Sequence, residues 1–158
     1  MSLRVFISYS AYDDQIIALR LQTLASVYGF SAYVPPATTR ERAAGASRLS
    51  PLVERELNSA DVIFAVVNHI PSEATIAELN HALARPNLVI PIVGRWVDRR
   101  FLQSFPKHFI LDPLNPSAVE RDIVAFLQKR KTDKETKQAV IGLAALVVGL
   151  LLLSTTKD

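Results

Sequence analysis

The chain has 158 residues, enough for one domain with a buried core and too few for two domains of ordinary size. It contains no cysteine, which excludes disulfide bonds, thiolate metal sites and cysteine nucleophiles, and its three histidines are too far apart in sequence to suggest a metal site. The formal net charge is +3. Five of the basic residues gather within 129–137, directly before the longest apolar run, so we expect a membrane and not nucleic acid as the partner of this charge.

The C-terminal part of the chain carries that apolar run. Residues 139–156 (AVIGLAALVVGLLLLSTT) hold no charged side chain, and their length is at the short end of the roughly 17–25 residues that a membrane-spanning helix needs. A buried core helix, the alternative, would normally show a polar stripe. Residues 132–138 form a basic linker before the run, and residues 157–158 a short tail. Because the basic residues precede the run, we expect a single-pass protein of the cell membrane whose N-terminal domain is cytoplasmic.

The first predicted elements are a strand, a helix and a second strand. Residues 3–8 (LRVFIS) are rich in β-branched and aromatic side chains, which predicts a buried strand. The next segment has apolar residues at helical spacing; Asp13 can cap this helix, and Gly29 ends it. Residues 30–34 (FSAYV) alternate between apolar and polar side chains and predict the second strand. The loop over residues 35–48 has a length that is usually functional or disordered.

Three further helices are predicted beyond this loop. The first begins after Ser50, which can cap it. The second spans residues 72–84, begins at Ser72 and ends before Pro86. The third is an amphipathic segment over residues 117–131. The predicted buried stripes hold Leu52, Val53, Leu57 and Ala60 in the first helix and Ile76, Leu79 and Leu83 in the second.

Three apolar runs alternate with these helices. Residues 62–67 (VIFAVV) are almost wholly apolar, as in a central parallel strand. Residues 88–93 (LVIPIV) predict another buried strand, in which Pro91 indicates a strand end or a sheet edge. Residues 109–111 predict a brief last strand. The alternation predicts an α/β fold whose central parallel sheet has helices on both faces, and ligands bind such sheets at the carboxyl ends of the strands.

Three features, in this order, resemble the TIR domain family. The opening RVFISYSAYDD resembles the first box of TIR domains, and the long loop after the second strand looks like their BB loop. The segment SEATIAEL resembles a TIR motif that reads Ser, then Trp-Cys, then Glu-Leu, and Ser72, Glu78 and Leu79 match it by position. Ala74 and Thr75 depart from it, because many members have Trp and Cys there. The resemblance covers residues 3–128 and implies a flavodoxin-like TIR domain over residues 1–131.

The resemblance also implies an activity. Many TIR domains cleave NAD⁺ at the nicotinamide–ribose bond, and Glu78 matches their essential carboxylate. Nicotinamide leaves as a neutral molecule, so a fixed negative charge that stabilises an oxocarbenium-like transition state is sufficient chemistry. NAD⁺ is then the substrate, and neither a resident cofactor nor a metal is implied. The implied substrate-binding residues are Ser8, Tyr9, Ser10, Tyr33, Arg40 and Ser72, and Tyr9, Tyr33 or Trp96 can replace the missing Trp as a stacking surface.

Alternatives remain open for both the residue and the function. By position alone, Glu78 fits an exposed helix glutamate, because it lies about 200° around the helix from Ile76. The chain fits a membrane-anchored NAD⁺ glycohydrolase or cyclase in anti-phage defence or cell-death signalling, a non-catalytic TIR adaptor, or a membrane-disrupting effector that acts by TIR assembly. Glu78 favours the enzyme, and the missing Trp favours the adaptor. The expected partners are other copies of the chain, through TIR–TIR contacts, membrane lipid, and a nucleotide-signalling or defence protein.

Overall fold

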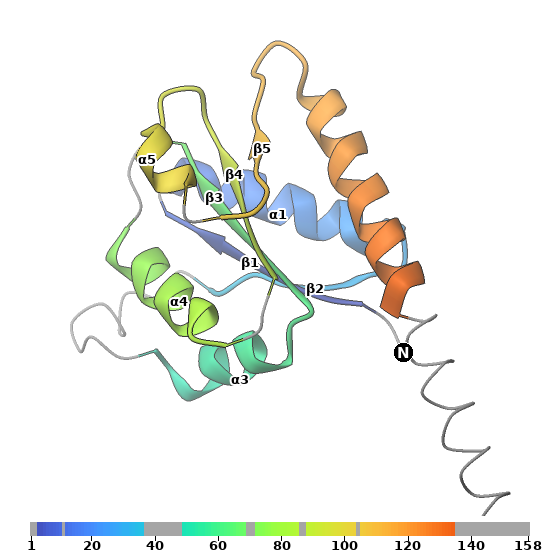
Figure 1. Ribbon diagram of the computed structural model, residues 1–158. Coiled ribbons are helices and arrows are strands. Elements are labelled where there is room, and N and C mark those ends of the chain that lie inside the picture. Colours follow the sequence, from blue (N-terminus) through green and yellow to red (C-terminus); the bar gives the residue numbers. More distant parts are fainter. Residues whose placement is uncertain are drawn as a thin grey trace, which may run out of the picture. The chain divides into compact units, whose positions relative to one another are not determined.

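A five-stranded parallel sheet forms the centre of the fold in the computed structural model (Figure 1). The structure describes residues 3–10, 12–36, 49–68, 72–85, 88–103 and 105–134. The strands are β1 (Arg4–Tyr9), β2 (Ser31–Tyr33), β3 (Val62–Val67), β4 (Leu88–Val93) and β5 (Phe109–Ile110). Their spatial order is β2-β1-β3-β4-β5, and every neighbouring pair is parallel. This is the flavodoxin-like order, which reverses between β1 and β3.

Helices cover both faces of this sheet, as the alternating pattern predicts. Helices α3 (Pro51–Ser59) and α4 (Glu73–Leu83) lie side by side on one face, and α1 (Tyr12–Val27) lies on the other (Figure 1). The short helix α5 (Arg99–Leu102) follows β4, and the first unit named below ends in a last helix that begins at residue 116. The chain divides into two units, Met1–Val124 and Ala125–Asp158; in the second unit, the described residues 125–134 are helical.

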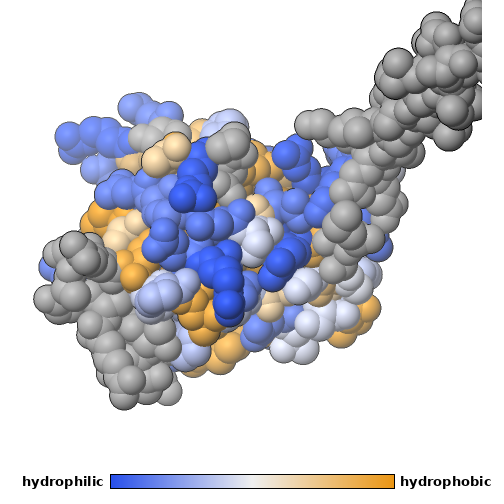
Figure 2. All heavy atoms as spheres, turned by 90° about the horizontal axis from the view of Figure 1, so that it is seen from below, coloured by the Kyte–Doolittle hydropathy of each residue, from blue (hydrophilic) through white to orange (hydrophobic). Residues whose placement is uncertain are grey.

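The central strands are apolar because they lie in the core of the domain. All of β3 is buried, and so are β1 and β4 from their second residue onward. Strands with helices on both faces have no side that faces water, so they lack the polar alternation of a half-exposed sheet. On the face of α3 and α4 the cluster joins all three strands to both helices; its members are Phe6, Val53, Leu57, Ile63, Ala65, Leu79, Ala82 and Val89. Figure 2 shows a face whose middle is dominated by hydrophilic side chains, with hydrophobic ones between them and at the margin.

Local signals set most element ends correctly. Ser50 caps α3 by accepting a hydrogen bond from the Val53 backbone NH at 3.2 Å. Ser72 caps α4 in the same way. Gly29 follows α1 with a φ of 82°, a left-handed conformation that glycine adopts without steric cost. The prediction for Asp13 was wrong, because α1 begins at Tyr12 and Asp13 lies inside its first turn.

The buried stripe of α4 differs from the prediction. Its buried residues are Thr75, Glu78, Leu79 and Ala82. Ile76 and Leu83, both expected inside, are 46% and 48% exposed. The small side chains of Thr75 and Ala82 let this face of α4 approach the sheet closely. In α3, Leu52 is likewise exposed, and only Val53 and Leu57 of the predicted stripe are buried.

Pro91 lies within a strand and not at its end. It pairs in register with Ala65 of β3, and β4 continues to Val93. The prediction of a strand end was therefore wrong. On its other side β4 pairs with β5 only from Ile92 onward, so at Pro91 this side needs no ladder hydrogen bond.

The predicted membrane segment is not tested by this fold. Within the described parts of the chain, no helix is long and apolar enough to cross a bilayer. The apolar run 139–156 and most of the basic linker lie outside the described residues. The membrane anchor therefore stays a prediction from the sequence.

Candidate functional site

The carboxyl ends of β1 and β3 mark the point where the strand order reverses. Crevices at such points are where open parallel sheets bind ligands. Ser8 and Tyr9 end β1, Ser10 follows it, and Asn68 directly follows β3. The first turn of α4 begins beside this edge at Ser72, as the hydrogen bonds between the two segments show. Four of the predicted site residues therefore lie together here, namely Ser8, Tyr9, Ser10 and Ser72.

The hydroxyl of Thr75 joins these residues. Thr75 Oγ1 lies 2.8 Å from the backbone carbonyl oxygen of Tyr9, which can only accept, so Thr75 donates this bond. The hydroxyl oxygens of Ser8, Ser10 and Ser72 lie 3.2, 3.1 and 3.2 Å from the same Thr75 oxygen. Thr75 and Ser8 are both fully buried, whereas Ser10 and Ser72 are half-buried. A single buried hydroxyl thus connects the end of β1 with the start of α4.

This arrangement has more donors than the central oxygen can accept. A hydroxyl oxygen accepts at most two hydrogen bonds, but three serine hydroxyls surround Thr75 Oγ1. At least one serine must therefore direct its proton to another acceptor at any moment. Ser10 and Ser72 are half-buried, so their hydroxyls are the ones in this cluster that reach the surface.

Tyr9 fastens the beginning of the long loop. Its ring is 5% exposed, and its hydroxyl donates to the carbonyl oxygen of Pro35 at 2.9 Å. Pro35 is the second residue after β2, so this bond ties the loop entrance to the carboxyl end of β1. Arg40 and the rest of residues 37–48 lie outside the described residues, and the predicted role of Arg40 stays a prediction.

Glu78 is a buried carboxylate on the same face of the sheet. It lies one helical turn after Thr75, and only 1% of its surface is exposed. Tyr33, the last residue of β2, pairs in register with Phe6, and the two rings lie 5.7 Å apart. Burial raises the pKa of Tyr33 above its ordinary value of 10.0; the negative charges of Glu56 and Glu78 raise it further, while Arg55 acts in the opposite direction. The phenol is therefore neutral at physiological pH and lies within the field of the Glu78 carboxylate.

Two properties of Tyr33 and Glu78 bear on the chemistry that the site can perform. The Tyr33 hydroxyl oxygen is buried and has no hydrogen-bond partner among the residues that the structure describes. Glu78 is only 1% exposed and is therefore shielded from water. The interpretation of Glu78 as an exposed helix glutamate was wrong, because it measured the angle from Ile76, which itself faces solvent.

Sequence reasoning treated Thr75 only as a departure from the TIR motif. A signal for its burial was present, because Thr75 shares a helix face with Leu79, four residues later. Asn68 was also missed. Its side-chain NH₂ donates to the buried carboxylate of Asp14 at 2.7 Å, which links the end of β3 to α1. Gly94 packs against it, because a Cβ at position 94 would lie 2.8 Å from the Asn68 carbonyl oxygen.

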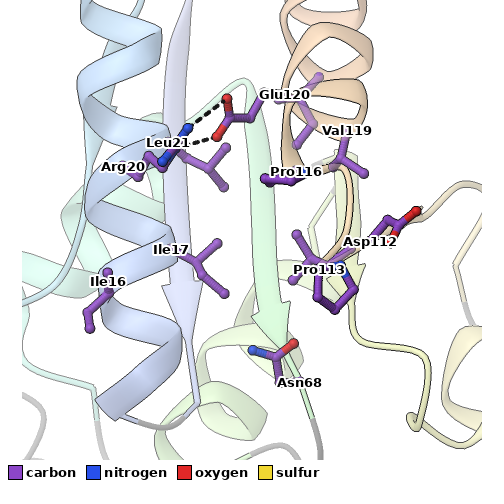
Figure 3. A pocket seen from close by; sticks show the side chains of 12 residues that line it. Ile16, Ile17, Arg20, Leu21, Asn68, Asp112, Pro113, Pro116, Val119 and Glu120 are labelled. Atoms are coloured by element: carbon purple, nitrogen blue, oxygen red, sulfur yellow. Dashed lines mark hydrogen bonds and ion pairs between the residues drawn. The ribbon is translucent and has the colours of Figure 1, made fainter.

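A separate pocket lies on the α1 side of the sheet (Figure 3). Its volume is about 380 Å³, and its walls come from α1, Asn68, residues 111–116 and the start of the last helix. Arg20 and Glu120 form an ion pair between the two helices. Most of the lining side chains are apolar, and neither Thr75 nor Glu78 is among them. The pocket is thus distinct from the polar site at the start of α4.

The remaining candidates are at the surface. Trp96 is 85% exposed in the turn after β4, and the neighbouring Arg95 forms an ion pair with Asp112 at 3.0 Å. In the described part of the chain, no group of three or more His, Asp or Glu side chains could hold a metal ion. No protein-family model matches the chain, and no curated protein matches it.

Proposed function

We propose that this chain is a TIR-type NAD⁺ glycohydrolase, held at the cell membrane by residues 139–156, with Glu78 as its catalytic carboxylate. The observation that carries the proposal is the burial of Glu78 one helical turn after Thr75, whose hydroxyl joins the start of α4 to the carboxyl end of β1. Burial of a carboxylate is costly, so a glutamate that is only 1% exposed is unusual and fits a functional role. The TIR-like motifs of the sequence support the same residue. A role in anti-phage defence or cell-death signalling rests on that resemblance.

Cleavage of the nicotinamide–ribose bond requires little acid–base catalysis by the protein. The bond between ribose C1′ and the nicotinamide nitrogen breaks, and its electron pair leaves with the ring, which becomes neutral nicotinamide. The ribose gains oxocarbenium character, and water then adds to C1′ and loses a proton. A buried negative charge near the ribose stabilises this transition state more than the ground state. The carboxylate of Glu78 would supply the charge, and the hydroxyls of Tyr33, Ser10 and Ser72 would bind polar groups of the substrate.

One observation favours an adaptor that binds partners without turnover. Ala74 occupies the position where many TIR enzymes have Trp, and its methyl group cannot stack on a nicotinamide ring. Among the three proposed substitutes, Tyr9 is buried, Trp96 is exposed in the turn after β4, and Tyr33 is the last residue of β2.

Release of nicotinamide separates the two functions. Full-length protein, purified in detergent or returned to lipid vesicles, is incubated with NAD⁺ with and without a crowding agent, and free nicotinamide is measured by chromatography. The enzyme proposal expects nicotinamide to accumulate in proportion to time. No release by the wild-type protein under any of these conditions would leave the adaptor as the better account.

A further inference from the structure

We infer that Thr75 is a positioning residue for Glu78. Its hydroxyl fastens the first turn of α4 to the carboxyl end of β1, and this attachment fixes where the Glu78 carboxylate lies. The inference rests on the proposed catalytic role of Glu78. Thr75 itself need not touch the substrate, because it acts through the position of α4.

Thr75 makes hydrogen bonds to residues that are distant in the sequence. Its hydrogen bonds to Ser8, Tyr9 and Ser10 join residues 65 to 67 positions apart in the sequence. The same oxygen also meets Ser72, whose hydroxyl accepts from the Thr75 backbone NH at 3.2 Å. Thr75 therefore holds the helix cap and the strand end at one point.

Thr75 and Glu78 lie one turn apart on the buried face of α4. Residues three apart on a helix lie on the same face, with Cβ atoms about 5–6 Å apart. Both side chains are buried against the sheet, Thr75 with 0% and Glu78 with 1% exposure. Because one turn of an α-helix is rigid, a shift or rotation at Thr75 moves the Glu78 carboxylate by a similar amount.

Apolar contacts also hold α4 against the sheet. Leu79 and Ala82 pack in the apolar cluster with Ile63 and Val89. Apolar burial is favourable but non-directional, so it tolerates small sliding and rotation of the helix. Hydrogen bonds weaken steeply when their angles change, so the Thr75 hydroxyl contacts at the first turn, together with the 2.8 Å contact between His81 and Asn58 of α3 near the other end, define the register that apolar packing leaves loose. Losing the Thr75 contacts should move the carboxylate without unfolding the domain.

The expected effect is a loss of turnover with little change in binding. A misplacement of about 1 Å at a reacting group can cost about 100-fold in rate. Thr75→Val keeps the shape of the side chain but removes the hydroxyl, so kcat for NAD⁺ cleavage should fall by about 10- to 100-fold. The KM should change by less than about threefold, because Thr75 is fully buried and its replacement removes no side chain that reaches the surface. Thr75→Ser retains the hydroxyl and should restore kcat to within about threefold of the wild-type value.

The experiment measures kcat, KM and the melting temperature of the full-length wild type, Thr75→Val, Thr75→Ala and Thr75→Ser. Thr75→Ala is the second variant without a hydroxyl, in case the valine methyl group prevents folding. Thr23→Val is the matched control, because Thr23 is exposed on α1 and its hydroxyl donates only to a carbonyl of its own helix, that of Leu19, among the described residues. All rates are measured well below the lowest melting temperature.

The outcomes separate this inference from the proposed function. A lower kcat in Thr75→Val and Thr75→Ala, recovery in Thr75→Ser and no change in Thr23→Val support the positioning role. If both hydroxyl-free variants melt earlier but turn over at the wild-type kcat, Thr75 is only structural and the inference is overturned. If the wild type itself does not cleave NAD⁺, the proposed function fails and the inference fails with it.

Discussion

Replacing Tyr33 by Phe removes one buried oxygen atom and leaves the contact between the rings of Tyr33 and Phe6 in place. In the unfolded chain this hydroxyl hydrogen-bonds to water. In the folded domain it is buried and finds no partner among the described residues. Leaving a buried donor unpaired costs about 1–3 kcal/mol, so its removal should not destabilise the protein. At pH 7 we expect Tyr33→Phe to keep the free energy of unfolding or raise it by up to about 1 kcal/mol.

The pH dependence gives the same prediction a second readout. The pKa of Tyr33 is raised above 10.0 in the folded state, first by burial and then by the charges of Glu56 and Glu78. The folded state therefore binds the phenolic proton more tightly than the unfolded state does. The stability that depends on this proton is fully present below about pH 10 and is lost as the pH rises through the folded pKa. Above pH 10 the wild type should lose stability more steeply than Tyr33→Phe.

The assay is urea unfolding followed by circular dichroism at pH 7 and at steps between about pH 9 and 11. A chain truncated after Lys134 keeps the apolar run out of the measurement. Tyr28→Phe is the matched control, because Tyr28 is 47% exposed and its change should stay within about 0.5 kcal/mol. If Tyr33→Phe lowers stability by more than about 1 kcal/mol at pH 7, the hydroxyl makes a favourable bond and the reasoning is refuted. Under the proposed function, the same variant should cleave NAD⁺ more weakly than wild type despite its unchanged stability.

Three further predictions concern packing, location and assembly. Gly94→Ala should lower the free energy of unfolding by about 1–3 kcal/mol in urea, because the new Cβ would lie 2.8 Å from a backbone oxygen of Asn68; an unchanged midpoint would contradict this. Full-length protein should sediment with membranes and a chain ending at Lys134 should not; a full-length chain that is soluble without detergent would rule out the anchor. On vesicles, NAD⁺ cleavage per molecule should rise steeply with surface density, because TIR–TIR contacts would complete the site and anchoring raises effective concentration; a constant rate per molecule argues against such contacts.

The fold was largely predictable because its signals are local. A buried parallel strand needs an apolar run, and the runs that became β1, β3 and β4 match the structure to within one residue. Ser50 and Ser72 act within one helical turn, and Gly29 acts on its own backbone, so none of them depends on distant partners. The strand order follows less directly from the sequence, because it depends on which helices pack together.

The orientation of α4 was not predictable in this way. A periodicity rule selects the most apolar stripe, which here contains Ile76 and Leu83. The structure instead buries the Thr75 hydroxyl and the Glu78 carboxylate. The Thr75 hydroxyl donates a hydrogen bond to the backbone carbonyl oxygen of Tyr9. The Tyr9 carbonyl that receives the Thr75 hydroxyl is 66 residues away in the sequence. Only the assembled sheet reveals such a partner.

The candidate site was also predictable only in part. Ser8, Ser10 and Ser72, which the TIR resemblance implied as substrate-binding residues, lie together where the carboxyl end of β1 meets the start of α4. The resemblance gave no indication that Thr75 joins them or that Glu78 is buried. Both facts depend on the rotation of α4, which the periodicity rule had assigned incorrectly.

The most direct test of the account compares Glu78→Gln with Glu73→Gln in the nicotinamide-release assay. Gln keeps the volume of Glu in a position that is 1% exposed, whereas Ala would leave a void and destabilise the core. Glu73 is an exposed residue in the first turn of the same helix, and its replacement controls for the loss of one negative charge. We predict that Glu78→Gln reduces NAD⁺ cleavage by about 10²–10³-fold, which corresponds to about 2.7–4 kcal/mol of transition-state stabilisation, while Glu73→Gln retains wild-type turnover. Wild-type turnover in a folded Glu78→Gln protein would contradict the central claim.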